Sequence, residues 1–361
     1  MLVDLLAAIE PLDEAAMDLC QLRLDNLTKP LGSLNGLEYL ARKVAGVTRK
    51  DKPRNIKRSI ILMAADHGVA EEGVGAFSSE VTWRRVVNCC HGQAVINSFA
   101  NYIDVQLVLV DVGIASDLPD LPTLRREKVR YGSANIIKGP AMTREETLRA
   151  IERGICVARD ELAKGIQIIG LGEFGTANTT SAAAVVACYA ALPIVKLAGK
   201  DNDMSSASFK HKVQVIEQAL AVNQPDIGDP LAVLAKLGGL EIAGLVGVIL
   251  AAAAGRAVVV IDGVVTAAAA LIAVKLAPEV KDYLVGSHLS CEPAHSVALE
   301  LIGIPAYLHL NLQLGEGTGA ALGISMIDAS LGMLNDMKTF GEAKVAIAQD
   351  GPGAVRQRLD V

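Results

Sequence analysis

Two glutamates in this chain stand in glycine-flanked turns that precede helix-like segments. Glu173 lies within the turn 170–175, and Glu316 lies within the turn 314–318. Glycine lets a ligand approach the backbone closely, and apolar surroundings raise the pKa of a carboxylate toward the range of a general base. A helix cap accounts for one such glutamate, with a gain of at most about 1 kcal/mol. The presence of two favours a shared site.

The first turn also fits the dinucleotide fingerprint G-x-G-x-x-G, through Gly170, Gly172 and Gly175. The apolar run before it and the small residues after it predict a strand, a turn and a helix. That arrangement offers backbone N–H groups and a positive helix end to a phosphate. Glu173, however, would repel a pyrophosphate. The turn therefore favours a ligand with a cationic or hydroxyl-rich part near Glu173 over NAD, and we predict no cofactor.

Three further segments place an acid beside a glycine where an apolar run ends: Asp66-His67-Gly68, Asp111-Val112-Gly113 and Asp262-Gly263. In a doubly wound sheet the ligand crevice lies beyond the carboxyl ends of the strands. These acids and Glu173 therefore predict one shared cleft. His67 fits either of two roles, a hydrogen-bonded turn residue or a contact to the substrate.

Metal chemistry is not expected from the remaining motifs. Val258–Ala267 resembles the ribose-binding signature of transferases that use phosphoribosyl pyrophosphate, but Gly263 replaces the second acid, which weakens magnesium binding. The loop 287–295 contains His288, Glu292 and His295 without a partner acid cluster. We expect this loop to form a hydroxyl and backbone cradle for a ligand.

Short β-rich runs alternate with helical patterns along the middle of the chain. The predicted strands are 59–63, 105–110, 166–169, 194–197, 257–261 and 306–310. Such alternation is typical of an α/β fold, a doubly wound, mainly parallel sheet with helices on both faces. We predict a large Rossmann-like domain over residues 49–318.

Amphipathic helical segments mark both ends of the chain. Three of them, 2–9, 14–27 and 34–44, open the chain, and a final segment, 319–340, is expected to return and pack on them. Residues 1–48 and 319–361 are therefore predicted to form a small helical domain.

Composition narrows the class of protein further. Of the 361 residues 51% are hydrophobic and only 3% aromatic, with a net charge of −6, so neither nucleic acid nor anionic lipid is an expected partner. The apolar stretch 257–274 is about as long as a membrane span. Asp262 and Gly263 interrupt it, which favours a buried strand followed by an Ala-rich helix. The N-terminus lacks the basic region of a signal peptide, so we expect a cytoplasmic protein with no membrane association.

These motifs, in this order, resemble the nicotinate-nucleotide–dimethylbenzimidazole phosphoribosyltransferase family, which activates the lower-ligand base of cobamides. The resemblance covers nearly the whole chain and is carried by Lys29–Leu34, Ala65–Val69, Asp111–Gly113, Gly139–Met142, Gly172–Ala184, Asn223–Pro225, Gly238-Gly239, Asp262-Gly263 and Leu314–Ala321. It implies the two-domain division above and a two-fold dimer.

The resemblance also implies a reaction. A base nitrogen attacks C1′ of nicotinate mononucleotide, nicotinate leaves, the configuration inverts from β to α, and Glu316 takes the proton of the nucleophile. No metal is implied, because the cationic ring is already a good leaving group. The residues that would contact the nucleotide are Glu173, Gly175, Asn178, Lys212, Asp262, Gly263 and Ser290. Those that would contact the small aromatic acceptor are Phe77, Arg85 and Leu314.

Two departures from the family pattern leave an alternative open. Asp201 stands where the phosphate-binding turn has a glycine, and a like charge about 5 Å from a phosphate costs on the order of 3 kcal/mol. Phe77 and Arg85 stand where members acting on benzimidazole have a small or hydroxylated residue and a Gln or apolar residue. The acceptor is then a phenol or p-cresol, or the chain is the non-catalytic subunit of a heterodimer with a catalytic paralogue.

Overall fold

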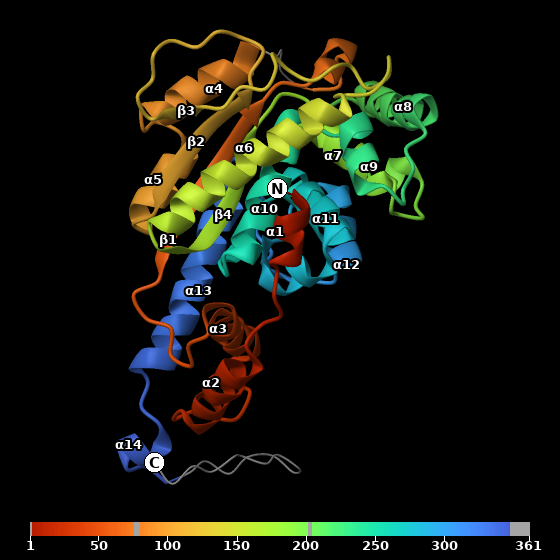
Figure 1. Ribbon diagram of the computed structural model, residues 1–361. Coiled ribbons are helices and arrows are strands. Elements are labelled where there is room, and N and C mark those ends of the chain that lie inside the picture. The colour runs from red at the N-terminus through yellow and green to blue at the C-terminus, as the bar shows by residue number, and fades with distance from the viewer. Residues whose placement is uncertain (1, 76–79, 201–203, 347–361) are drawn as a thin grey trace.

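The computed structural model describes residues 2–75, 80–200 and 204–346. Within these residues seven parallel strands form one sheet, in the order β3-β2-β1-β4-β5-β6-β7 (Figure 1). The strands are β1 (Lys57–Ala65), β2 (Gln106–Gly113), β3 (Leu124–Arg126), β4 (Ile166–Phe174), β5 (Val258–Ile261), β6 (Leu284–His288) and β7 (Ala306–Leu308). The order confirms the predicted doubly wound parallel sheet.

Both faces of the sheet are covered, which is why its central strands are almost continuously apolar. The last seven residues of β1 and all four of β5 are buried. The helices are α1 (Leu2–Ala7), α2 (Glu14–Asn26), α3 (Asn35–Thr48), α4 (Glu80–Cys90), α5 (Val95–Tyr102), α6 (Arg144–Ala163), α7 (Asn178–Ala187), α8 (Ser206–Asn223), α9 (Pro230–Leu237), α10 (Leu240–Ala254), α11 (Val264–Leu276), α12 (Pro293–Ile302), α13 (Thr318–Asp336) and α14 (Phe340–Ala343).

The path of the chain explains how the helices divide between the faces. From β1 to β2 the chain moves in one direction along the sheet, and from β4 to β7 it moves in the other. Right-handed crossovers therefore place α4 and α5 on one face and α10, α11 and α12 on the other. On the first face, α13 packs on β4, β5 and β6 and contacts α5 (Figure 1). On the second face, α6 packs on α10.

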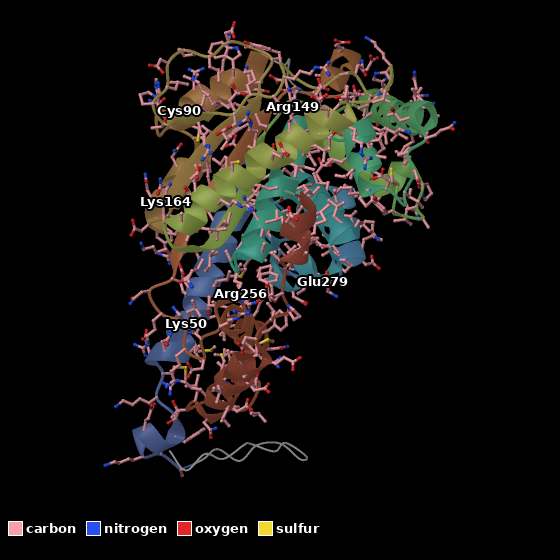
Figure 2. All side chains as sticks on the ribbon, in the orientation of Figure 1. Lys50, Cys90, Arg149, Lys164, Arg256 and Glu279 are labelled. Carbon is pink, nitrogen blue, oxygen red and sulfur yellow. The ribbon has the colours of Figure 1, made fainter. Side chains whose placement is uncertain are left out.

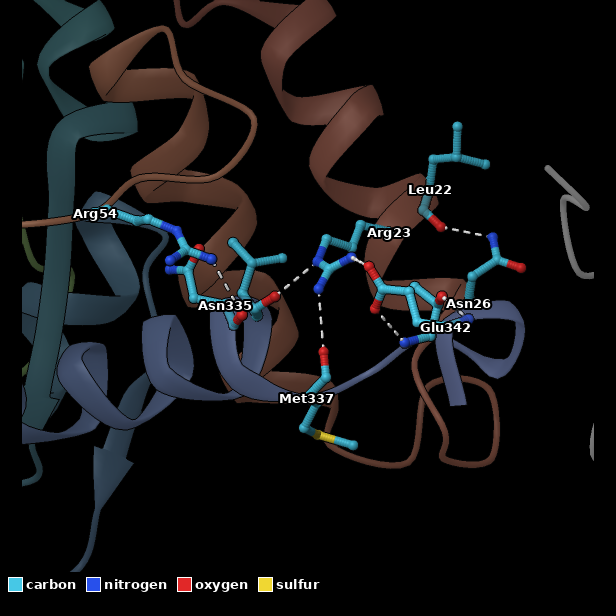
Figure 3. Close-up of polar contacts among 9 residues, drawn as sticks. Leu22, Arg23, Asn26, Arg54, Asn335, Met337 and Glu342 are labelled. Carbon is cyan, nitrogen blue, oxygen red and sulfur yellow. Dashed lines mark hydrogen bonds and ion pairs between the residues drawn. The ribbon is translucent and has the colours of Figure 1, made fainter. Parts of the chain in front are cut away.

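The two ends of the chain meet below the sheet, as the helical patterns predicted. α3 packs on α13, and Leu27 pairs with Thr339 in an antiparallel bridge. Arg23 of α2 donates to the Leu334 and Met337 carbonyl oxygens, at 2.9 and 3.1 Å, and to the Glu342 carboxylate (Figure 3).

Several contacts join these terminal helices to the rest of the chain. Arg256, which is labelled in Figure 2, follows α10. It donates to the carbonyl oxygens of Gly46 and Val47 at the end of α3. α13 itself runs from the sheet to α2 and α3 (Figure 1). The division into two domains stays a prediction, and residues 347–361 of the smaller one lie outside the described residues.

Four elements differ from the sequence expectation. The predicted turn 170–175 is mostly strand, because β4 continues through Gly170 and Gly172 to Phe174 and contains Glu173 as its penultimate residue. The predicted strand 194–197 is a 3-10 helix (Ile194–Lys196) after Pro193, on a largely exposed segment with no neighbouring strand to pair with. The strands β3 and β6 were not predicted. β6 is fully buried, but it contains Gly286, Ser287 and His288, which do not give the apolar pattern of a buried strand. It is stabilised there because the Ser287 hydroxyl donates to the Ile261 carbonyl oxygen at 2.6 Å.

The long apolar stretch 257–274 is divided as expected, into β5 and the Ala-rich α11. In the part of the chain that the structure describes, no helix combines the length and the apolar character that crossing a membrane requires.

Candidate active site at the strand switch point

A cavity of about 580 Å³ opens at the carboxyl edge of the sheet, within the size range of small-molecule sites. It lies where β1 and β4 are neighbours but their following connections leave to opposite faces, the position at which open α/β sheets bind ligands. The predicted site residues in its wall are Arg85, Glu173, Gly175, Asn178, Gly263, Ser290 and Leu314. Of the four acids that were expected to share one cleft, only Glu173 lines this cavity. Asp66 and Asp111 instead accept from the backbone N–H groups of Ala115 and Ile114.

The two glutamate turns converge because glycine backbones touch there. A Cβ atom on Gly172 of β4 would lie 2.6 Å from the Gly317 nitrogen, and one on Gly315 would lie 2.6 Å from Glu173 Oε1. Gly315, Glu316 and Gly317 all have positive φ angles, of 74°, 60° and 79°. Glycine adopts a positive φ angle without steric cost, so the backbone strain in this turn lies at Glu316.

Glu316 lies just behind the cavity wall and is paired with a cation. Its side chain is 8% exposed, and Oε1 accepts hydrogen bonds from Arg85 Nε at 3.0 Å and Nη2 at 2.5 Å. Arg85 comes from α4, which is tied to the first turn by the Thr82 and Thr176 hydroxyls, 2.9 Å apart. The guanidinium lines the cavity, whereas Glu316 is not among the lining residues.

Glu173 is in the opposite electrostatic situation. Its Oε2 accepts a hydrogen bond from the Asn178 side-chain amide at the start of α7. Burial raises the pKa of Glu173 to about 8, although the Asn178 hydrogen bond acts against the rise. The negative charges of Glu241 and Asp262 add to it, and the more distant Arg85 lowers it. The raised pKa favours the protonated form of this carboxyl.

Asp262 faces α13 rather than the cavity. It is 1% exposed, and its two oxygens accept from the backbone N–H groups of Gly317, Gly319 and Ala320 at 2.9, 2.7 and 3.3 Å. Burial raises its pKa to about 6 against these three hydrogen bonds. Asp262 is thus the cap of α13, while its neighbour Gly263 supplies the cavity wall.

The remaining predicted residues are placed at different depths. Lys212 of α8 is 1% exposed and reaches the cavity only through Thr179, whose hydroxyl accepts from Nζ at 3.3 Å. Ser290 lines the cavity, and its backbone N–H donates to His295 Nδ1. Leu314 is 43% exposed at the cavity mouth. Phe77 and Asp201 lie outside the described residues.

Other wall residues were not predicted. They include Thr176, Thr179, Ser205, Ser208 and Gln313. The sequence could have indicated them, because hydroxyl residues stand at the starts of α7 and α8, and helix starts in this fold lie near the carboxyl ends of the strands. His288 from the predicted cradle loop is also in the wall, and burial lowers its pKa to about 4, so it is neutral there. Among the described residues, no three or more His, Cys, Asp or Glu side chains are grouped to hold a metal ion.

Comparison with known proteins finds phosphoribosyltransferases. A phosphoribosyltransferase family model matches residues 9–345. A protein of Geobacter metallireducens named nicotinate-nucleotide–dimethylbenzimidazole phosphoribosyltransferase is 46% identical over 350 residues, which cover 97% of this chain and 99% of that protein. One of the same name from Chloroflexus aggregans is 45% identical over 338 residues, 94% of this chain and 96% of its own length.

A solved structure shares the whole fold as well. The crystal structure of CobT from Thermus thermophilus matches with a TM-score of 0.88 at 39% identity, covering 92% of this chain and 100% of that one. The extent of these matches and the cavity at the strand switch point have one common explanation: the chain belongs to the nicotinate-nucleotide–dimethylbenzimidazole phosphoribosyltransferase family.

Proposed function

We propose that this chain transfers the phosphoribosyl group of nicotinate mononucleotide to a small aromatic acceptor in the cavity between Glu173 and Glu316. The acceptor attacks C1′, the bond from C1′ to the nicotinate nitrogen breaks, and its electron pair leaves with nicotinate. The configuration at C1′ inverts from β to α, and Glu316 takes the proton of the acceptor. The observation that carries this proposal is that both glutamate turns meet at one cavity.

The nucleotide occupies the side of the cavity formed by β4 and α7. Backbone N–H groups around Gly175 and Asn178, at the start of α7, suit the phosphate, since a helix N-terminus attracts anions. Glu173, Gly263 and Ser290 suit the ribose. Lys212 supports this wall through Thr179, and Asp262 holds the turn that carries Glu316.

The acceptor occupies the side formed by Arg85 and Leu314. A guanidinium beside the nucleophile stabilises an oxygen that develops negative charge and gives no such help to a neutral benzimidazole. Arg85 thus favours a phenol or p-cresol over dimethylbenzimidazole.

The test is an assay of the purified chain with nicotinate mononucleotide and each of the three acceptors, with the riboside phosphate product followed by mass spectrometry. Product with at least one acceptor is expected, most of it from the phenols. An absence of product with all three, from a chain shown to be folded, contradicts catalysis by the lone chain.

A second candidate function rests on the Arg85–Glu316 ion pair, which occupies the carboxylate that should accept the proton. In this reading the chain is the non-catalytic subunit of a heterodimer and stabilises a catalytic paralogue. Activity that appears only on mixing with such a paralogue, and that survives Glu316→Gln in this chain, favours the second candidate. Activity of the lone chain eliminates it.

We also propose that the protein is cytoplasmic and forms a dimer, either with a second copy or with a paralogous chain. The resemblance to the family supports the dimer. Light scattering of the purified chain tests it: a monomeric mass at micromolar concentration contradicts the homodimer, and a shift to twice that mass on adding a paralogue supports the heterodimer.

A further inference from the structure

A buried polar cluster lies behind the cavity, and the proposed reaction does not use it. It consists of His67 after β1, Ser181 in α7 and Glu241 in α10, which are 3%, 0% and 0% exposed. His67 Nδ1 is 2.9 Å from Ser181 Oγ, and Nε2 is 2.5 Å from Glu241 Oε1. One histidine therefore joins three elements that meet at the strand switch point.

Only one of the two carboxyl oxygens of Glu241 has a hydrogen-bond partner within the cluster. Glu241 lies in the first turn of α10, and its second oxygen, Oε2, is buried with no hydrogen-bond partner among the described residues. An acid placed in this way costs free energy, because burial without a partner disfavours a polar group.

The cluster reaches Glu173 by two routes. The first route runs through α7. Asn178 donates to Glu173, and Ser181, one helical turn later, contacts His67. His67 therefore holds the helical turn whose first residue binds Glu173. Through space, the charge of Glu241 raises the pKa of Glu173.

Other charged groups also face Glu173. From α4 the guanidinium of Arg85 lowers its pKa, and from the end of β5 Asp262 raises it. Glu316, on the turn that contacts Glu173, is already paired with Arg85. The cation that is nearest to the site is thus committed to the other glutamate, which leaves the negative charge of Glu241 with the larger influence on Glu173.

We propose that His67 and Glu241 are positioning residues that hold Glu173 in the cavity as a neutral carboxylic acid. A neutral acid both donates and accepts hydrogen bonds and so suits ribose hydroxyls. It also does not repel a phosphate at the start of α7, which removes the conflict between an acid in this turn and an anionic ligand. The identity of the ligand rests on the proposed function, whereas the protonation of Glu173 does not.

The first test measures Glu173 directly in the ligand-free protein. Infrared difference spectra between the wild type and Glu173→Gln, recorded across a pH series, isolate the carboxyl band of this residue. We expect the protonated band to persist at pH 7 and to disappear with a midpoint near pH 8. A carboxylate already present at pH 6 overturns the proposal, whatever the variants below do.

The second test removes the charge behind Glu173. In Glu241→Gln, which preserves the shape of the side chain, the midpoint of Glu173 should fall by about one pH unit or more. Glu279→Gln, an exposed acid after α11, is the matched control and should leave the midpoint unchanged. An unchanged midpoint in Glu241→Gln overturns the role of that residue.

The third test asks what the neutral acid does for the ligand. Calorimetric affinity for nicotinate mononucleotide should weaken by roughly tenfold between pH 7 and pH 9, after correction for phosphate ionisation, as Glu173 becomes charged. Nicotinate riboside lacks the phosphate and should show no such loss, and a loss of equal size for both ligands overturns the phosphate argument. Absence of transfer activity together with a Glu173 midpoint near pH 8 would reject the proposed function and leave the protonation of Glu173 supported.

Discussion

The end of β4 and the turn before α13 are alike in sequence and opposite in electrostatics. Each places a glutamate between glycines at the carboxyl edge of the sheet. Glu316 is held by the Arg85 guanidinium, while Glu173 is held by a neutral amide and has the charge of Glu241 behind it. A local pattern can thus bring two acids to one ligand without assigning them the same protonation state.

The two turns also differ in what keeps them in place. Glu173 ends a regular strand and lies opposite Met63 of β1 in the sheet register. Glu316 has a left-handed backbone, in a turn whose following N–H groups are bound by the buried Asp262. The sheet positions the first acid, and a single carboxylate from another strand positions the second. Four experiments test these differences.

The largest effect is expected from Glu316→Gln. Loss of a general base lowers kcat by about 10²–10⁴-fold, because the acceptor then has no residue to take its proton. Glu173→Gln is the matched comparison and should cost far less, since an amide resembles a neutral acid. Steady-state kinetics at pH 7 measure both, and equal losses would show that the two glutamates do not differ in role.

Asp262→Asn should destabilise the fold by about 1–3 kcal/mol, because a side-chain amide turns an N–H donor toward backbone N–H donors that now bind a carboxylate. The control is Asp229→Asn at the start of α9, where an asparagine caps a helix about as well as an aspartate. Urea denaturation at pH 7.5 compares them. If both variants lose the same free energy of unfolding, the cap of α13 contributes no more to stability than an ordinary helix cap.

Arg85→Met should shift acceptor preference by about tenfold toward dimethylbenzimidazole, as the cation that favours a phenol oxygen is lost. The exposed neighbour Arg84 is absent from the cavity wall, so Arg84→Gln is the matched control. The ratio of kcat/KM for the two acceptors is the readout. An unchanged ratio in Arg85→Met would mean that the ion pair does not set acceptor choice.

The fourth effect is a change in the pH dependence of stability. The pKa of Glu173 is raised by folding, from 4.5 to about 8, so the folded state binds more protons in that window and stability falls as pH rises through it. Glu173→Gln should remove a decline of at most about 1.4 kcal/mol per pH unit. Denaturant midpoints at pH 5, 6, 7 and 8 measure this, and a wild-type curve parallel to that of the variant contradicts a buried neutral acid.

Much of the fold was predictable because its causes are local. Apolar β-branched runs such as 258–261 specify buried strands, and the small-residue segment from Asn178 specifies a helix wherever they lie in space. The glycines at 172 and 315 predicted close approach of a ligand. Gly315 lines the cavity, whereas Gly172 makes room for the backbone of Gly317. The strand prediction for 194–197 was wrong because β propensity is a local property, whereas a strand also needs a neighbouring strand to pair with.

The sequence was sufficient to predict a parallel sheet and two acidic, glycine-flanked segments at its carboxyl edge, although the first of them is the end of β4 and not a turn. Only the tertiary structure decided that Asp262 caps α13, that Arg85 neutralises Glu316 across 231 residues of chain, and that Glu241 stands behind Glu173. Backbone conformation depends on neighbours in sequence, whereas the charge state of a buried acid depends on groups a few ångströms away that the fold brings from distant segments.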